Sequence, residues 1–122
     1  MPLLAYLFAL VLIAAGCYHF INPQFYDPFM PDWFPKVAAN AAGGLAELLI
    51  GVAMLVPATR QVGLYAAAAL MLVFLPLHVI DLGRARPVIG SKPIAVGRLL
   101  LQFLLIGWLY YLAKAYSVGP PR

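Results

Sequence analysis

The chain has 122 residues, of which 65% are hydrophobic and 10% are charged, and its formal net charge is +4. Soluble domains carry about 25% charged residues, so this composition excludes an ordinary water-soluble domain, and the length leaves room for one domain over residues 1–122. The lysines and arginines flank apolar runs instead of forming one basic cluster, which excludes nucleic acid as the partner.

Four apolar runs predict transmembrane helices at about residues 2–21, 36–56, 62–82 and 93–115. Each run is close to the ~20 residues that a helix needs to cross a ~30 Å hydrocarbon core. The first three runs are followed by residues that end helices, Asn22-Pro23, Pro57 and Gly83, and the fourth begins at Pro93, a favourable first helical residue. We therefore expect an all-α fold, an integral membrane four-helix bundle.

The first run has no positively charged region before it, since no charged side chain precedes Asp27. A secretory signal begins with such a region, so we expect the first run to be a retained membrane helix. It contains the single cysteine, Cys17, and one thiol excludes an intrachain disulfide and dithiol redox chemistry.

The segment between the first two helices, residues 22–35, is rich in prolines and aromatic residues. It contains Pro23, Pro28, Pro31 and Pro35 together with Phe25, Tyr26, Phe29, Trp33 and Phe34. Aromatic rings at this density beside a span are typical of the headgroup interface. Asn22 can cap a short helix here. Two interpretations stay open: a flat cover over one end of the bundle, or a lid over a ligand cavity.

Glu47 lies near the middle of the second predicted helix. A carboxylate at that depth costs on the order of 2.5–3.5 kcal/mol, so such groups usually face the bundle interior or a cavity. Asn40, Gly44, Glu47 and Gly51 follow helical spacing and form one stripe of small and polar residues, which is the composition that allows close helix approach in lipid. The stripe predicts the inward face, whether Glu47 has a structural or a functional role.

Further polar residues lie in the same half of the bundle once the helices are taken as antiparallel. His19 ends the first helix, His78 and Asp81 end the third, and Arg98 and Gln102 begin the fourth. Arg98 lies roughly 8 Å and Glu47 roughly 18 Å from their helix starts, and two extended side chains can span the remaining ~10 Å. Two interpretations of Arg98 stay open: it pairs with Glu47 or with an anionic ligand, or it snorkels to the lipid headgroups. The candidate ligand-binding residues are Glu47, Arg98, His78, His19, Gln102, Asn40 and Asp81; no spacing among them indicates a metal site.

Three stretches of the chain resemble the DoxX family of small bacterial inner-membrane proteins. They are Ala14–Tyr26 with His19-Phe20 and Asn22-Pro23, Gly43–Gly51 followed by Pro57–Arg60, and Arg98–Gln102 followed by Trp108 and Tyr110. The resemblance implies a four-helix bundle in the bacterial cytoplasmic membrane. Its named members include a membrane subunit of an archaeal thiosulfate:quinone oxidoreductase, and more distant ones act as chaperones or cargo receptors.

These observations favour a membrane protein that holds a small amphipathic ligand, a quinone or a lipid, in a polar half-bundle cavity. The alternatives are an accessory or chaperone-like partner of another membrane protein, and a homodimeric proton-coupled transporter with Glu47 as the proton carrier. An isomerase that uses Glu47 and His78 as acid and base also stays open. Enzymatic activity is therefore undecided, and no residue is assigned as catalytic.

Overall fold

The computed structural model describes residues 1–117, and all regular structure in that range is helical. The long helices are α1 (Leu3–Ile21), α2 (Lys36–Leu55), α3 (Arg60–Gly83) and α4 (Lys92–Ser117). Short 3₁₀ helices lie between them: η1 (Pro23–Phe25), η2 (Asp27–Phe29) and η3 (Pro57–Thr59). The four α-helices are long and apolar enough to cross a membrane, which confirms the predicted number of helices and their spanning length. Residues 118–122 of the predicted domain lie outside the described range.

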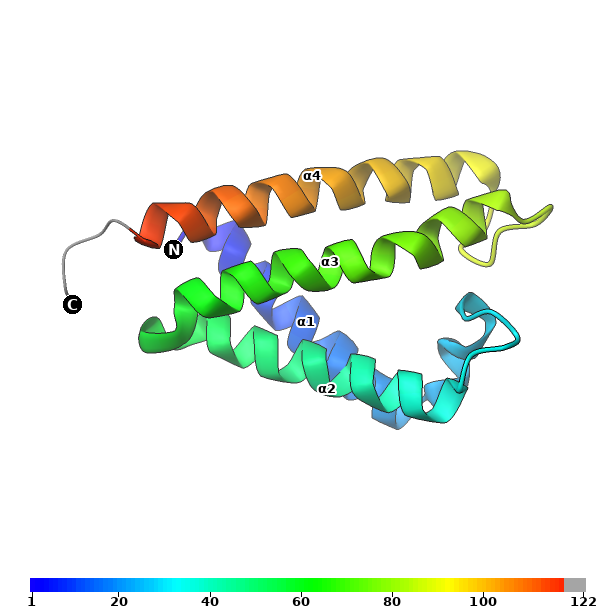
Figure 1. Ribbon diagram of the computed structural model, residues 1–122, viewed down its shortest axis with the longest axis horizontal. Coiled ribbons are helices and arrows are strands. Elements are labelled where there is room, and N and C mark those ends of the chain that lie inside the picture. Colours follow the sequence, from blue (N-terminus) through cyan, green and yellow to red (C-terminus); the bar gives the residue numbers. More distant parts are fainter. Residues whose placement is uncertain (118–122) are drawn as a thin grey trace.

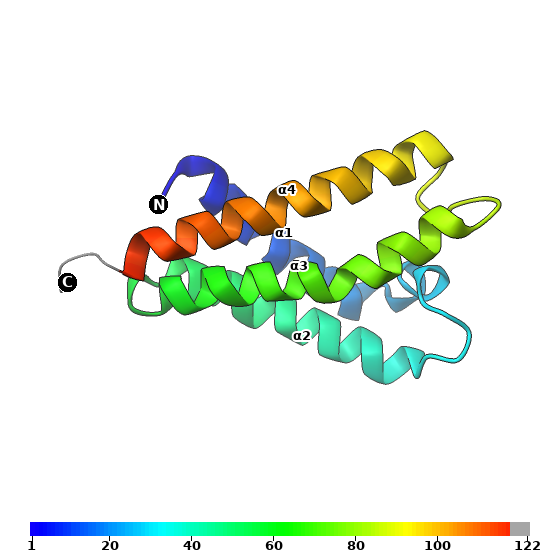
Figure 2. The same ribbon diagram turned by 45° about the horizontal axis from the view of Figure 1, so that its top comes forward.

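The helices form two antiparallel pairs, α1 with α2 and α3 with α4 (Figures 1 and 2). The turn at η3 joins the pairs and holds α2 beside α3. From that turn α2 and α3 diverge, and the segment 22–35 lies between their separated ends (Figure 1). We call the end with η3 the closed end and the end with the segment 22–35 the open end.

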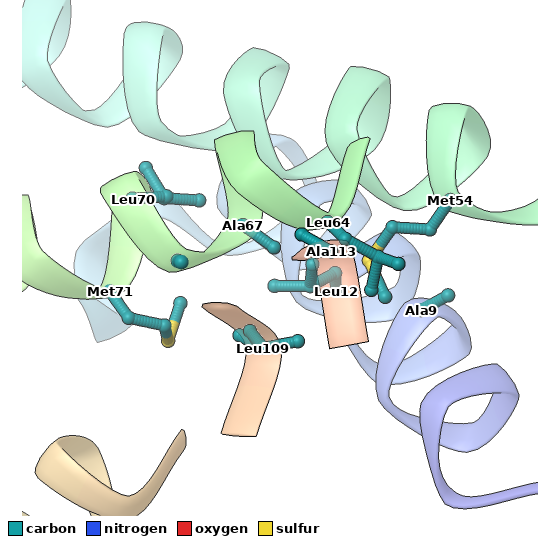
Figure 3. Packing of buried hydrophobic residues seen from close by; sticks show 10 residues of the cluster. Ala9, Leu12, Met54, Leu64, Ala67, Leu70, Met71, Leu109 and Ala113 are labelled. Atoms are coloured by element: carbon teal, nitrogen blue, oxygen red, sulfur yellow. The ribbon is translucent and has the colours of Figure 1, made fainter. Parts of the chain in front are cut away.

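The closed end is filled by an apolar core to which all four long helices contribute (Figure 3). The buried side chains are Ala9, Leu12, Met54, Leu64, Ala67, Ala68, Leu70, Met71, Leu109 and Ala113. Arg60 covers the last turn of α2, where its guanidinium donates to the carbonyl oxygens of Met54 at 2.9 Å and Leu55 at 3.0 Å. These carbonyls would otherwise lack partners at the helix end.

Glycines allow α1 and α2 to pack against each other along the predicted stripe. Asn40, Gly44, Glu47 and Gly51 are all buried, which confirms that this face of α2 points inward. A Cβ atom at Gly44 would lie 2.6 Å from the Cβ of His19, and one at Gly51 would lie 2.9 Å from the carbonyl oxygen of Ala9. On the facing helix, a Cβ at Gly16 would lie 2.7 Å from the carbonyl oxygen of Gly44. Only glycine fits these positions without a shift.

The segment 22–35 contains two 3₁₀ helices in place of the single capped helix that Asn22 suggested. The Asn22 side chain makes no cap hydrogen bond and instead donates to the Tyr18 hydroxyl at 3.0 Å. Pro28 explains the interruption, because proline disfavours helical geometry at the residue before it and has no N–H to donate. Arg84 fixes the segment to the loop after α3 by donating to the carbonyl oxygen of Pro28 at 2.7 Å.

Candidate functional site

The open end contains a cavity of about 720 Å³ between α2, α3 and the segment 22–35. Most of its wall is apolar or aromatic, with contributions from Phe25, Phe29, Trp33, Phe34, Phe74 and Leu77. Four of the predicted site residues also line it, one from each long helix: His19, Glu47, His78 and Arg98. Its volume lies within the range of about 300–1,000 Å³ that is typical of small-molecule pockets.

The His19 imidazole makes contact with α2 through both ring nitrogens. Its Nε2 lies 2.7 Å from Oε1 of Glu47, and its Nδ1 lies 2.6 Å from Oδ1 of Asn40. The Asn40 amide nitrogen donates to the carbonyl oxygen of His19 at 2.7 Å. All three residues are buried. One imidazole therefore connects the end of α1 to two positions of α2 that lie about two turns apart.

Hydrogen-bond chemistry determines how many protons this group holds. The carbonyl oxygen of His19 only accepts, so the Asn40 amide nitrogen must face it and the Asn40 Oδ1 must face Nδ1. Nδ1 therefore carries a proton. A separation of 2.7 Å between Nε2 and the Glu47 oxygen requires one more proton between them. Whichever atom holds that proton, the His19–Glu47 pair has no net charge.

Tyr26 holds the His19 ring from the open end. The two rings are stacked with centroids 3.6 Å apart and planes 10° apart, and the Tyr26 hydroxyl donates to the carbonyl oxygen of Ala15 at 3.2 Å. Burial raises the pKa of Tyr26, and the nearby carboxyl of Glu47 and then Tyr18 raise it further. Tyr26 is therefore a neutral phenol. Tyr26 was expected in the aromatic segment but is not one of the candidate ligand-binding residues; the aromatic density of the segment 22–35 is the signal in the sequence that points to it.

Arg98 pairs with Asp81, and Glu47 pairs with His19, so the expected Glu47–Arg98 pair does not form. Nη2 of Arg98 lies 3.0 Å from Oδ2 of Asp81, and Nη1 of Arg84 lies 3.2 Å from Oδ1 of the same carboxylate. Asp81 is fully buried. It also accepts from the backbone N–H groups of Val88 at 2.6 Å and Ile89 at 3.3 Å. Asp81 thus organises the loop between α3 and α4.

The remaining predicted residues support the site without lining the cavity. The Gln102 side chain donates to the carbonyl oxygen of Met71 at 2.9 Å and so connects α4 to α3. Asn40 orients His19, and Asp81 holds Arg98. His78 and Asp81 are three residues apart, but His78 lines the cavity whereas Asp81 faces the loop. Within residues 1–117, no cluster of three or more His, Cys, Asp or Glu side chains is arranged to hold a metal ion.

Comparison with known protein families corrects the resemblance noted in the sequence. Residues 8–113 match a family described as a domain of unknown function (DUF8561). The resemblance to DoxX proteins is therefore wrong, and the link to a quinone oxidoreductase loses its basis. The chain matches no curated protein and no solved structure. The stretches that suggested DoxX consist mainly of small and apolar residues, which many membrane helices share.

Proposed function

We propose a function for this chain, which belongs to the DUF8561 family. From the geometry of the cavity, it is an integral membrane protein that binds a small amphipathic molecule at its open end. One observation carries the proposal. Polar groups from all four helices, the buried His19–Glu47 pair and the half-buried His78 and Arg98, meet a cavity whose other walls are mostly apolar. The proposed location is a lipid bilayer; the narrower expectation of a bacterial cytoplasmic membrane came from the DoxX resemblance and is not retained.

The outward faces of the helices support a location in lipid. Large hydrophobic side chains that are more than half exposed occur on every long helix, for example Leu3 at 73%, Leu49 at 61%, Leu72 at 56% and Leu104 at 70%. Soluble proteins rarely expose contiguous apolar patches larger than a few hundred Å². Hydrocarbon is the solvent that such faces match, and the small-residue contact between α1 and α2 is the packing that membrane helices use.

The distribution of polarity supports an amphipathic ligand. Polar groups at membrane depth are costly, and they usually face a cavity or another polar group. Here they gather at the open end, while the closed end is filled by apolar side chains. The head of an amphiphile would meet His19, Glu47, His78 and Arg98, and its tail would lie against the aromatic and aliphatic walls between α2 and α3.

The test is to identify what copurifies with the protein. The chain would be purified from membranes in a non-ionic detergent, extracted with organic solvent and analysed by mass spectrometry. Ala42 lines the cavity and its neighbour Ala41 does not, so Ala42→Phe and Ala41→Phe form a matched pair. We expect one amphipathic compound to be enriched with the parent and Ala41→Phe, and lost from a folded Ala42→Phe. Equal enrichment in all three samples, or none, would refute ligand binding in the cavity.

A second candidate function, proton-coupled transport, is favoured by one specific observation. The His19–Glu47 pair lines the cavity and holds one proton between Nε2 and Oε1, 2.7 Å apart. A ligand that takes or gives this proton would couple its own movement to that of the proton. In proteoliposomes with a trapped pH dye, this candidate expects ligand-driven acidification or alkalinisation that Glu47→Gln abolishes. Ligand binding without any pH change in the parent protein would exclude it.

A further inference from the structure

We infer that the ligand of the proposed function carries an acidic head, a carboxylate or a phosphate monoester, which binds at Arg98. This inference rests on the proposed function, because it names the chemical class of the molecule in the same cavity. It depends on the charges that surround Arg98 and on the groups that could neutralise them.

The cluster around Asp81 has more positive than negative charge. Two guanidinium groups, those of Arg84 and Arg98, face the single carboxylate of Asp81 at 3.2 Å and 3.0 Å. That carboxylate also accepts from two backbone N–H groups, which spread its negative charge further. Of the two arginines, only Arg98 lines the cavity, whereas Arg84 lines a separate surface pocket with Asp27, Asp32 and Lys36. Arg98 therefore shares its carboxylate partner with a second guanidinium, and its positive charge beside the cavity is only partly neutralised. In a poorly solvated site such a charge favours the binding of an anion.

No other group that lines the cavity supplies the missing negative charge. The His19–Glu47 pair of α1 and α2 is neutral because it holds a proton between its two members. His78 on α3 is either neutral or positive and never negative. Tyr26 of the segment 22–35 is a neutral phenol, because burial and the nearby Glu47 raise its pKa. Gln102, one turn along α4 from Arg98, carries no charge.

The position of Arg98 gives an anion access to the remaining charge. Arg98 lines the cavity and keeps 18% of its side-chain surface exposed. Its Nη2 donates to Oδ2 of Asp81, whereas its Nε is buried and has no hydrogen-bond partner among the described residues. The Phe29 ring lies 5.4 Å from the guanidinium carbon and shields that face. A planar guanidinium with unused donors suits the two oxygens of a carboxylate or phosphate.

The size of the cavity favours an amphiphile with one chain. Its volume of about 720 Å³ is that of a pocket for a small molecule. Aromatic side chains of the segment 22–35 and residues of α2 and α3 form the apolar part of the wall. The inferred ligand class is therefore a single-chain lipid acid, with its head at Arg98 and its chain along the apolar wall.

The experiment uses the protein in nanodiscs of a zwitterionic lipid, with Trp33 as the reporter. Trp33 lines the cavity, and the only other tryptophan, Trp108, is removed by Trp108→Phe. The probes are dibrominated stearate and dibrominated stearyl alcohol, which share a chain and differ in the head. Quenching of Trp33 measures the affinity of each. Competition by unlabelled stearate and by stearyl phosphate distinguishes a carboxylate head from a phosphate head.

We expect the acid to bind at least about tenfold more tightly than the alcohol, which corresponds to about 1.4 kcal/mol. Arg98→Gln should abolish this preference, and Arg86→Gln, at an exposed position that does not line the cavity, should keep it. If Arg98→Gln does not fold, Arg98→Lys serves instead: it keeps the charge but loses the planar fork, and it should reduce the preference several-fold. Equal binding of acid and alcohol to the parent would overturn the inference alone. Binding of neither probe would overturn the proposed function itself.

Discussion

Nε2 of His19 lies 2.7 Å from Oε1 of Glu47, and this contact joins the end of α1 to the middle of α2. On the other side of the same ring, Asn40 accepts from Nδ1, so Nδ1 carries a proton and Nε2 is left to share a second one with Glu47. The pair is buried between two helices whose contact surface contains glycines. It is therefore a neutral hydrogen-bonded pair at a depth where a separate carboxylate would be costly.

Substitution of Glu47 by glutamine should be well tolerated, because the amide N–H of glutamine can donate to Nε2 of His19 as the shared proton does. We expect Glu47→Gln to change the free energy of unfolding in detergent by less than about 1 kcal/mol. Glu47→Ala leaves Nε2 without a partner and should cost about 1–3 kcal/mol. Thermal unfolding followed by circular dichroism compares the two. Equal losses would contradict the prediction that a neutral hydrogen-bond donor at position 47 is enough to satisfy Nε2.

Two glycine substitutions should have opposite effects, because Gly44 lies in the contact between α1 and α2 whereas Gly107 has open space beside it. Gly44→Ala places a Cβ 2.6 Å from the Cβ of His19 and should destabilise the protein by about 1–3 kcal/mol. Gly107 lies in α4 with nothing within 4 Å of its added Cβ, so Gly107→Ala should stabilise by about 0.5–1 kcal/mol through helix propensity. Melting temperatures in one detergent measure both. A neutral Gly44→Ala would mean that α1 and α2 are not in close contact there.

The carboxylate of Asp81 holds the loop between α3 and α4 as well as Arg98. Asp81→Asn removes the negative charge that faces two guanidinium groups. It also weakens the hydrogen bonds that the backbone N–H groups of Val88 and Ile89 donate to this side chain. We expect a loss of about 3 kcal/mol, near the lower limit for a broken buried ion pair, since both arginines keep some exposure.

The control for this prediction is Asp32→Asn, at an exposed position, which should change the free energy of unfolding by less than about 0.5 kcal/mol. Limited proteolysis provides a local measurement, because cleavage in the loop 84–91 should accelerate in Asp81→Asn only. If the two variants unfold alike, Asp81 does not organise that loop.

The two loops at the open end should lie on one side of the membrane and the η3 turn on the other. Arg84 connects these loops through its bond to the carbonyl oxygen of Pro28. In a Cys17→Ser background, single cysteines at Asp32, Arg86 and Ala58 would be labelled in sealed vesicles with an impermeant maleimide. We expect Asp32→Cys and Arg86→Cys to react from the same side and Ala58→Cys from the opposite side. Labelling of Asp32→Cys and Ala58→Cys from one side would refute the four-span arrangement.

Local patterns in the sequence determined the helices and the inward face of α2. The length of an apolar run and the residues that end it are local features of the sequence, so they predict a helix without information about the helices that pack against it. The spacing of Asn40, Gly44, Glu47 and Gly51 likewise refers to one helix, and all four are buried in the structure. The same patterns are shared by many membrane helices, which explains why they led to the wrong family.

Tertiary structure alone decided which polar groups meet. The rise of 1.5 Å per residue gives the depth of each side chain along its helix, and it placed Glu47 and Arg98 in the same half of the bundle. Depth does not say which helices are neighbours or which way each is rotated. Because α1 packs on α2 and α3 on α4, Glu47 meets His19 and Arg98 meets Asp81. The divergence of the two helix pairs, which opens the cavity between them, follows from packing across the whole bundle and has no counterpart in any one stretch of sequence.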